Sequence, residues 1–358
     1  MKVLFITKQK SVAGSSYSVS YLAKGLAEKG HDVWLGARKE AFLLKLVESD
    51  KQLKTVHFAF KGYADWKTSR EIAAFVKEHK IDIVNAQSGQ DRFMMVLARF
   101  LFGLSAKVVF TRRQRPRDEP WIKRFLHTKT ASIVVISDGL KILFKKKGYR
   151  EDQLKVIYNG LPKALNKAVD PATVHVLRQQ YRIPEGNKVV GCISRLKEQH
   201  QIIRACPFLA PNITLLFVGI EQAQVQEVID DVAPQQHLVF TSVLDHQQVL
   251  NHYPLMDVNI LASKMDGFGL TLVEAMALGV PVIGSDFGGI RSVIGDNENG
   301  LLFENGDIHG LADQINALLY DQLLRENLIK KGREAYLTRF NIEQTITAYE
   351  AYFQELLK

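Results

Sequence analysis

Short apolar runs alternate with longer amphipathic segments along almost the whole chain. The short runs predict strands, and the segments between them repeat apolar side chains at helical spacing. Strands that are apolar at nearly every position are typical of parallel sheets covered by helices on both faces. In the first half, strands are predicted at Val3–Thr7, Asp32–Ala37, Thr55–Phe60, Ile81–Ala86, Lys107–Thr111, Ile133–Ser137 and Lys155–Tyr158, and helices at Ser16–Lys29, Lys67–His79 and Arg92–Phe102.

A second series of the same kind follows Asn159-Gly160-Leu161-Pro162 and a polar stretch. Its predicted strands are Lys188–Ser194, Ile213–Gly219, Leu238–Val243, Val258–Ala262, Pro281–Ser285 and Gly300–Phe303. We therefore predict an α/β protein with two doubly wound, Rossmann-like domains, residues 1–165 and 166–340. Ligands of such sheets bind beyond the carboxyl ends of the strands, which here predicts a cleft between the domains.

The last segment, residues 341–358, predicts a helix. Asn341 is a suitable N-cap, and Ile342, Ile346, Tyr349 and Phe353 follow helical spacing. We expect this C-terminal helix to pack back on the N-terminal domain.

The composition is that of a soluble globular protein: 358 residues, 46% hydrophobic and 24% charged. No apolar run approaches the roughly 18 residues that a membrane-spanning helix needs. The two cysteines, Cys192 and Cys206, lie in apolar surroundings. They are predicted to be buried thiols, which fits a reducing cytoplasm.

The charge is distributed unevenly between the two halves. Residues 1–165 contain 32 Lys and Arg against 15 Asp and Glu, whereas residues 166–358 contain 15 against 23. This asymmetry predicts an anionic partner for the first half: a phosphorylated lipid, a membrane surface or nucleic acid. The basic stretch has no recognisable nucleic-acid-reading motif, so nucleic acid is the least favoured of the three.

One segment combines two carboxylates with a glycine-flanked turn. It reads Asp266-Gly-Phe-Gly-Leu-Thr-Leu-Val-Glu274, and the predicted helix, about Leu270 to Leu278, stops at Gly279. The turn presents the N–H groups and partial positive charge of a helix N-terminus. An anion there would lie between two carboxylates, which suits a phosphorylated, hydroxyl-rich ligand such as a nucleotide sugar.

With both series in place, the chain resembles the retaining glycosyltransferases of the GT-B fold, group 1 (family 4). The resemblance covers essentially the whole chain and is strongest over Leu238–Asp307, where the two-carboxylate segment is followed by Gly288-Gly289 and Gly300-Leu301-Leu302-Phe303. It implies an enzyme that moves a sugar from a nucleotide-diphosphate donor to a hydroxyl group. Bacterial cell-envelope and lipopolysaccharide enzymes of this kind are the expected relatives.

The resemblance implies that Asp266 contacts hydroxyls of the donor sugar and that Glu274 holds the ribose of the nucleotide. The N–H groups of Gly267, Phe268, Gly269, Leu270 and Thr271 are expected to meet the diphosphate. Two plainer interpretations remain open. Asp266 would be a helix cap, and Glu274 a first-turn glutamate favoured by the helix dipole.

A second element, Gly191-Cys192-Ile193-Ser194-Arg195-Leu196, ends a strand with a cation. The family has an arginine followed by a lysine that stabilise the departing nucleoside diphosphate. Arg195 matches the arginine, because a guanidinium suits bidentate phosphate contact, and a surface arginine is the alternative. His200 stands where the family has the lysine, and Lys197 is the other residue that would take this role.

Two further elements lie in the first half. Gly14, with Ser15 and Ser16, follows the first strand where relatives have two glycines facing the diphosphate and the acceptor; either serine would otherwise be a helix cap. Arg113 stands where relatives often have a histidine near the reacting sugar. It would hold a phosphate on the acceptor or be a solvated arginine, and the leaving phosphate would take the acceptor proton.

No metal and no cofactor beyond the donor are expected, because the chain has no Asp-x-Asp after a strand and its histidines show no ligand spacing. Two alternatives to a transferase stay open. One is a sugar-nucleotide epimerase of similar architecture, and the other is a non-catalytic protein that binds sugar nucleotides.

Two basic stretches alternate apolar and cationic residues at helical spacing: Trp121–Leu126, preceded by Arg112–Arg117, and Leu140–Lys147. Lying on anionic lipid, each cation would contribute about 1 kcal/mol. Ordinary domain helices with solvated lysines are the alternative. We expect a cytoplasmic enzyme that is peripheral at the inner face of the cytoplasmic membrane and acts on an anionic lipid-linked or glycan acceptor.

Overall fold

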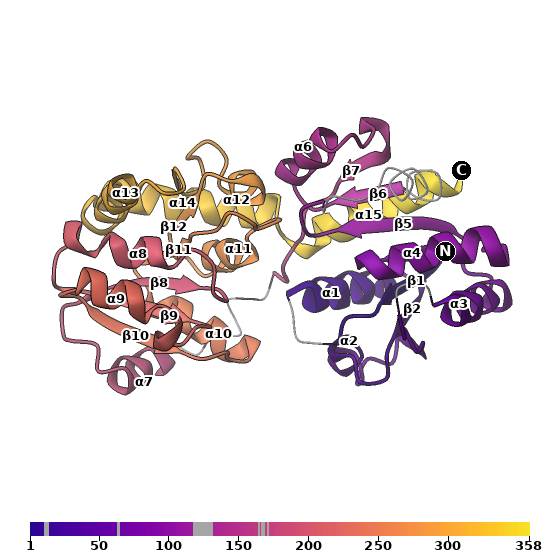
Figure 1. The fold of residues 1–358 in the computed structure, drawn as a ribbon, viewed down its shortest axis with the longest axis horizontal. Helices are drawn as coiled ribbons and strands as arrows, with labels where there is room; N and C mark the ends of the chain where they lie inside the picture. The colour runs from indigo at the N-terminus through magenta and orange to yellow at the C-terminus, as the bar shows by residue number, and fades with distance from the viewer. Residues whose placement is uncertain (11–13, 63–64, 117–131, 164, 166–168, 170–171) are drawn as a thin grey trace. The chain divides into compact units, whose positions relative to one another are not determined.

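The computed structural model describes residues 1–358 apart from 11–13, 63–64, 117–131, 164, 166–168 and 170–171. The chain divides into two compact units (Figure 1). Unit 1 consists of Met1–Pro162 together with Asn341–Lys358, and unit 2 consists of Lys163–Phe340. Each unit is built on one parallel sheet, as the sequence predicts.

The sheet of unit 1 has the strand order β3-β2-β1-β4-β5-β6-β7, and all its pairings are parallel. The order reverses between β1 and β4, which is the place where doubly wound sheets bind ligands. The strands are β1 (Lys2–Thr7), β2 (Asp32–Ala37), β3 (Lys54–His57), β4 (Ile83–Ala86), β5 (Lys107–Arg112), β6 (Ser132–Val135) and β7 (Leu154–Val156).

The central strands of this sheet are buried on both faces, whereas the edge strand β3 is largely exposed. In β1, Val3 and Phe5 join a core cluster with α1 and the C-terminal helix, while Leu4 and Ile6 are buried on the opposite face. Alternate residues of a strand point to opposite faces, so a sheet covered on both sides needs apolar residues throughout. The helices of unit 1 are α1 (Gly14–Glu28), α2 (Phe42–Leu46), α3 (Trp66–His79), α4 (Gly89–Phe102), α6 (Asp138–Lys146) and α15 (Ile342–Leu357).

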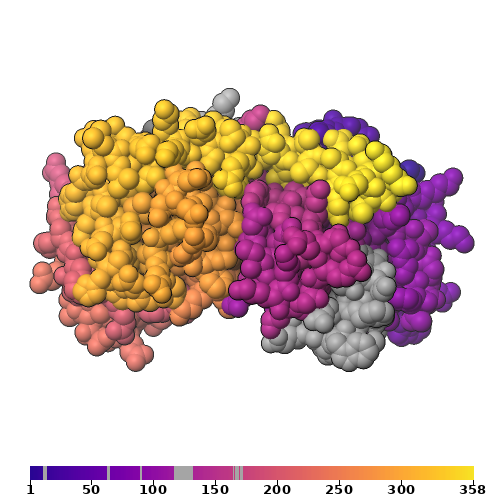
Figure 2. Space-filling model, turned by 90° about the horizontal axis from the view of Figure 1, so that it is seen from above, coloured from indigo at the N-terminus to yellow at the C-terminus, as the bar shows by residue number. Residues whose placement is uncertain are grey.

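Helix α15 belongs to unit 1 although it is the last element of the chain. The Asn341 side chain accepts the Gln344 N–H at 3.1 Å, which confirms the predicted cap. Tyr349 and Phe353 are buried in the same core cluster as β1. The surface of this helix, yellow in Figure 2, adjoins the magenta surface of the β6–β7 region, where Lys155 Nζ lies 5.5 Å from the Tyr352 ring centroid.

Unit 2 contains a six-stranded parallel sheet in the order β10-β9-β8-β11-β12-β13. Its strands are β8 (Lys188–Ile193), β9 (Ile213–Val218), β10 (His237–Thr241), β11 (Val258–Leu261), β12 (Val282–Ser285) and β13 (Leu301–Phe303). Its helices are α7 (Ala172–Gln180), α8 (His200–Arg204), α9 (Gln226–Val232), α10 (His246–His252), α11 (Leu270–Ala277), α12 (Gly288–Ile294), α13 (Ile308–Tyr320) and α14 (Gln322–Thr338). The order reverses between β8 and β11, and the loops that follow these two strands carry the predicted site.

All the predicted strands are present, but several end or begin one to three residues inside the predicted range. β3 ends at His57, because the Arg38 guanidinium donates to the carbonyls of Ala59 and Phe60 and the chain turns there, with Phe60 at φ 47°. β10 ends at Thr241, and the side chain of Val243 is 76% exposed.

Candidate functional site

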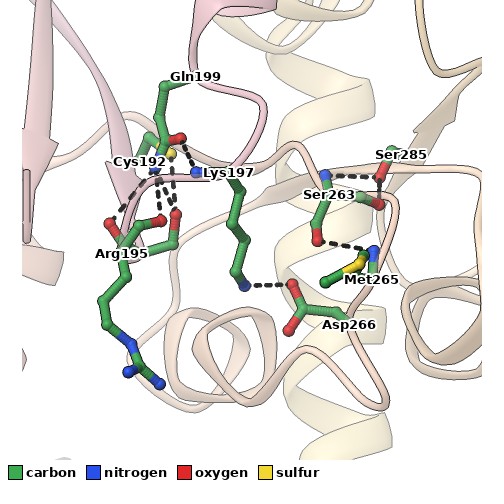
Figure 3. A network of polar contacts seen from close by, with 9 residues as sticks. Cys192, Arg195, Lys197, Gln199, Ser263, Met265, Asp266 and Ser285 are labelled. Atoms are coloured by element: carbon green, nitrogen blue, oxygen red, sulfur yellow. Dashed lines mark hydrogen bonds and ion pairs between the residues drawn. The ribbon is translucent and has the colours of Figure 1, made fainter. Parts of the chain in front are cut away.

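The loop from β11 to α11 is held by side chains of the neighbouring strand. The Ser285 hydroxyl, at the end of β12, donates to the Ser263 carbonyl at 2.7 Å and accepts the Ser263 N–H at 3.0 Å. Ser263 Oγ in turn accepts the Met265 N–H at 3.1 Å. Asp266 follows directly, so its backbone is fixed before the turn into α11 begins (Figure 3).

Two glycines make this turn possible. Gly269 adopts φ 88°, which side chains disfavour, and immediately precedes α11. A Cβ on Gly289 would lie 2.2 Å from the carbonyl carbon and oxygen of Gly267, so only glycine allows the start of α12 to approach the loop this closely. The Gly289 N–H donates to the Asp266 carbonyl at 3.3 Å.

The Asp266 carboxylate forms an ion pair with the Lys197 ammonium group, which comes from the loop after β8 (Figure 3). The two side chains remain 22% and 29% exposed, so a ligand can still reach them. The position before α11 is occupied by Gly269, which makes no side-chain capping bond. The interpretation of Asp266 as a helix cap is therefore wrong.

Gln199, which the sequence reasoning missed, organises the loop after β8. Its side-chain oxygen accepts the Lys197 N–H at 2.6 Å, and its amide donates to Ser194 Oγ at 2.7 Å and to the Arg195 carbonyl at 3.0 Å. Gln199 is 1% exposed, so these bonds are shielded from water. The Arg195 side chain is exposed, and in Figure 3 its guanidinium points away from Lys197.

His200 lies apart from the Asp266 carboxylate. It is the first residue of α8, and its Nε2 is 3.7 Å from Oε2 of Glu198. Its half-exposed ring borders a hollow of about 550 Å³ that is also lined by Lys197, Arg204 and residues of α9. Of the two candidates for the family lysine, the structure brings Lys197, and not His200, to Asp266.

Glu274 is buried, with 4% of its surface exposed, one turn inside α11. Its Oε2 lies 2.7 Å from the Tyr253 hydroxyl, and its Oε1 lies 3.1 Å from His246 Nε2. Burial, and next the charge of Glu274, raise the pKa of Tyr253 well above its usual value, so the hydroxyl stays a donor. Glu274 is the fifth residue of α11, which makes the first-turn interpretation wrong.

Tyr253 and His246 were missed by the sequence reasoning, since neither belongs to a recognised motif. His246 begins α10, and Tyr253 directly follows that helix in a single 3-10 turn. The Tyr253 hydroxyl also lies 3.0 Å from the Thr271 carbonyl. It therefore ties Glu274 to the first turn of its own helix.

The predicted residues of unit 1 lie at the carboxyl ends of its strands. Helix α1 begins at Gly14, so Ser15 and Ser16 lie inside it and neither is its cap. The Ser15 hydroxyl donates to Gln9 Oε1 at 3.0 Å. The predicted loop residues 11–13, and the stretch 121–126, lie outside the described residues.

Arg113 follows β5 and is partly exposed. Its Nη1 donates to Oε1 of Gln87, which follows β4. Burial lowers the pKa of Arg113, although a guanidinium keeps its charge at any pH of interest. Arg113 is thus held by the neutral amide of Gln87 at the carboxyl end of the sheet and is not a freely solvated side chain.

Cys192 and Cys206 are buried free thiols, as predicted, and burial raises the pKa of each to about 12. The described residues include no group of three or more His, Cys, Asp or Glu side chains placed to hold a metal ion. Within the same residues, no helix combines the length and apolar character required to span a bilayer.

Two family models match the chain, one on each half. The model described as Glycosyltransferase Family 4 matches residues 12–164, and the model described as Glycosyl transferases group 1 matches residues 174–335. Together they cover most of the chain and nearly all of the elements described above.

Individual proteins agree with these models. The chain is 26% identical over 385 residues to N-acetyl-alpha-D-glucosaminyl L-malate synthase of Bacillus anthracis, covering 99% of this chain and 97% of that protein. It is 22% identical over 290 residues to the lipopolysaccharide core biosynthesis mannosyltransferase LpsB of Rhizobium meliloti, covering 76% and 79%.

The fold is also that of a solved structure, Anabaena HepE in complex with UDP and glucose. The TM-score is 0.82 at 21% identity, with 99% of this chain and 100% of that chain covered. At this identity the likeness supports the GT-B fold alone. The two family models show the family as well as the fold: the chain belongs to the group 1 (family 4) glycosyltransferases and is a glycosyltransferase.

Proposed function

We propose that this enzyme transfers a sugar from a nucleoside-diphosphate donor to a hydroxyl group, with retention of configuration at the anomeric carbon. In the step, the bond from the anomeric carbon to the phosphate oxygen breaks and a bond to the acceptor oxygen forms on the same face of the sugar. The departing phosphate takes the proton of the acceptor hydroxyl. No base from the protein and no resident metal ion are then required.

The observation that carries the proposal is the ion pair of Asp266 with Lys197 beside the start of α11. A carboxylate accepts hydrogen bonds from vicinal sugar hydroxyls, and an ammonium group neutralises phosphate. The N–H groups of Gly269, Leu270 and Thr271 are unused by the described residues, because an α-helix leaves its first donors without partners. Sugar and diphosphate would meet complementary groups at the start of α11, supplied by the loops after β8 and β11.

The nucleotide would extend from this loop toward Glu274. The hydrogen-bond partners Tyr253 and His246 occupy one side of each carboxylate oxygen, and each oxygen can accept more than one hydrogen bond. The ribose hydroxyls would donate to the remaining positions. Tyr253 and His246 therefore act as positioning residues for a ribose-binding carboxylate.

Lys197 is the proposed counterpart of the family lysine. Without donor it neutralises Asp266, and with donor bound its flexible side chain would turn to the diphosphate and leave the carboxylate to the sugar. Arg195, whose guanidinium is exposed, would contribute a second positive charge to the leaving group. His200 lies beside Glu198 and is assigned no catalytic role.

Relatives in cell-envelope synthesis support an envelope glycan or lipopolysaccharide core as the acceptor, and the R. meliloti enzyme is named for that process. The B. anthracis relative, which matches over 99% of this chain, is named for a small hydroxy acid, L-malate. Both kinds of acceptor offer a hydroxyl next to anionic groups. The basic first half of the chain fits either.

Association with the inner face of the cytoplasmic membrane is part of the same proposal. On α6, Ile142 is 54% exposed and lies one turn from Lys146, which is also exposed. Lys141 and Lys145 of this helix pair with Glu151 at 3.0 and 2.6 Å, so the exposed charge available to lipid is smaller than the sequence suggests. Sedimentation with anionic vesicles tests this, comparing Ile142→Ser with Val176→Ser, an equally exposed valine on α7 of unit 2.

The proposed donor class is tested by thermal unfolding with UDP, GDP, ADP and CMP sugars. UDP sugars are tested first, because the structure of HepE was solved with UDP. We expect one nucleotide to raise the unfolding temperature, and slow hydrolysis of its sugar without acceptor. Conversion to an epimer would support the epimerase alternative, and protection without any turnover would support a binding protein. Protection by none of the four would contradict the proposal.

A further inference from the structure

A row of hydrogen-bonded polar side chains lies at the carboxyl ends of β4 and β5 in unit 1. Asn85 and Gln87 come from β4 and the residue after it, and Thr111 and Arg113 come from β5 and the residue after it. Residues two apart on a strand point to the same face. All four lie on the face where Tyr349 of α15 packs, because Thr111 Oγ1 is 3.2 Å from the Tyr349 hydroxyl.

The donor and the acceptor can be assigned for each hydrogen bond in this row of side chains. Thr111 Oγ1 donates its single proton to Asn85 Oδ1 at 2.9 Å, so the Tyr349 hydroxyl must donate to Thr111. Gln87 Nε2 also donates to Asn85 Oδ1, at 2.7 Å, which leaves Gln87 Oε1 to accept from Arg113. The amide orientations of Asn85 and Gln87 are therefore both fixed by their partners.

Two donor nitrogens in this row of side chains have no acceptor among the described residues. Asn85 is fully buried, and its Nδ2 has no hydrogen-bond partner among the described residues. The same holds for Nε of Arg113. No described Asp or Glu forms an ion pair with Arg113. Among the described residues, only neutral groups contact this partly buried guanidinium, and Gln87 links it to a buried amide that also has an unpaired N–H. Such a pair of unmet donors is costly for a fold to keep.

An anion removes this cost, since carboxylate and phosphate oxygens accept bidentate hydrogen bonds from a guanidinium. We propose that Arg113, Gln87 and Asn85 form a subsite that binds an oxyanion of the acceptor, a carboxylate or a phosphate next to the hydroxyl that receives the sugar. Arg113 supplies the charged contact, Gln87 orients the guanidinium, and Asn85 supplies a further N–H. The subsite rests on the proposed function only in assigning the anion to the acceptor.

Binding of simple anions to the full chain tests the subsite directly. Isothermal titration with inorganic phosphate and with malonate should show saturable binding of at least one of them to the wild type. Arg113→Gln should weaken that binding by about tenfold or more, the usual effect of losing one charge-assisted contact. The matched control is Arg115→Gln, which removes the same charge from an exposed position two residues away and should change the affinity less than twofold. Equal weakening by both variants, or no binding to the wild type, would overturn the subsite.

A nearly isosteric change provides a second test that does not depend on removing the arginine. Asn85→Asp keeps the oxygen that accepts from Thr111 and Gln87 and replaces the unpaired N–H with a negatively charged oxygen. It should abolish anion binding while the unfolding temperature stays the same or rises, because the carboxylate partly compensates Arg113. Anion binding at wild-type affinity in this variant would refute the role of Asn85.

Turnover separates the two sources of the anion and separates this inference from the proposed function. If the anionic group is a phosphate, the donor should be turned over faster with glycerol phosphate as acceptor than with glycerol. If the group is a carboxylate, the donor should be turned over faster with malate than with dimethyl malate. Equal rates within both pairs would overturn the subsite. If nucleotides protect the wild type and Arg113→Gln alike while no anion binds, the subsite alone fails. If no nucleotide protects the wild type, the proposed function itself fails.

Discussion

The hydroxyl of Tyr253 lies 2.7 Å from Oε2 of Glu274, and both side chains are buried in unit 2. A carboxylate that is 4% exposed would ordinarily be costly, and this hydrogen bond and that of His246 offset part of the cost. The same bonds fix the rotamer of Glu274. The two residues come from different elements, the turn after α10 and helix α11.

Tyr253→Phe tests whether this bond positions Glu274 for the donor. The variant keeps the ring and loses only the hydroxyl, so KM for the nucleotide sugar should rise about tenfold, as expected for one hydrogen bond to a charged group, while kcat changes little. Steady-state kinetics give both values. Tyr181→Phe is the control, because it removes the hydroxyl that bonds His252, the residue before Tyr253, at 2.8 Å and leaves the bond of Tyr253 to Glu274 in place. Similar changes in both variants would point to a general loss of stability.

Lys197→Met should lower kcat by about 10² to 10³, the size of effect found when one group that stabilises a leaving charge is removed. His200→Ala should leave kcat within about threefold, because its ring lies beside Glu198 and apart from Asp266. Donor turnover at saturating substrate checks both. The reverse ranking would return the lysine role to His200 and contradict the assignment made from the ion pair.

The strands of both sheets were predictable because parallel strands that are covered on both faces consist of nearly continuous runs of apolar residues. The loop of Asp266 was predictable because the glycines it needs lie next to it or, in the case of Gly289, in a nearby motif. The pair of Lys197 with Asp266 was not, since it joins residues 69 positions apart through the fold. The contacts of Gln199 and Tyr253 depend on packing in the same way and leave no local pattern.

Gly289→Ala should lower the free energy of unfolding of unit 2 by about 1 to 3 kcal/mol or more, the range for overpacking a site that cannot relax. The added Cβ would meet the backbone of Gly267 at 2.2 Å, so the loop of Asp266 must shift. Urea unfolding measures the change. Gly62→Ala is the control, because a Cβ there has no heavy atom within 4 Å. Equal stability of the two variants would contradict the close approach.

Asp91 should make the stability of unit 1 depend on pH. It is fully buried, and burial raises its pKa from 3.8 to about 6, although Ser88 and Lys8 donate backbone N–H groups to it at 2.8 and 3.1 Å. Because the folded pKa is the higher one, its contribution is complete below pH 3.8 and is lost as the pH rises through about 6. The loss amounts to about 2 to 3 kcal/mol. Asp91→Asn does not titrate, so the difference in free energy of unfolding between wild type and variant should shift in favour of the variant between pH 4.5 and 7.5. A difference that stays constant over this range would show that the two backbone donors keep the carboxyl ionised throughout.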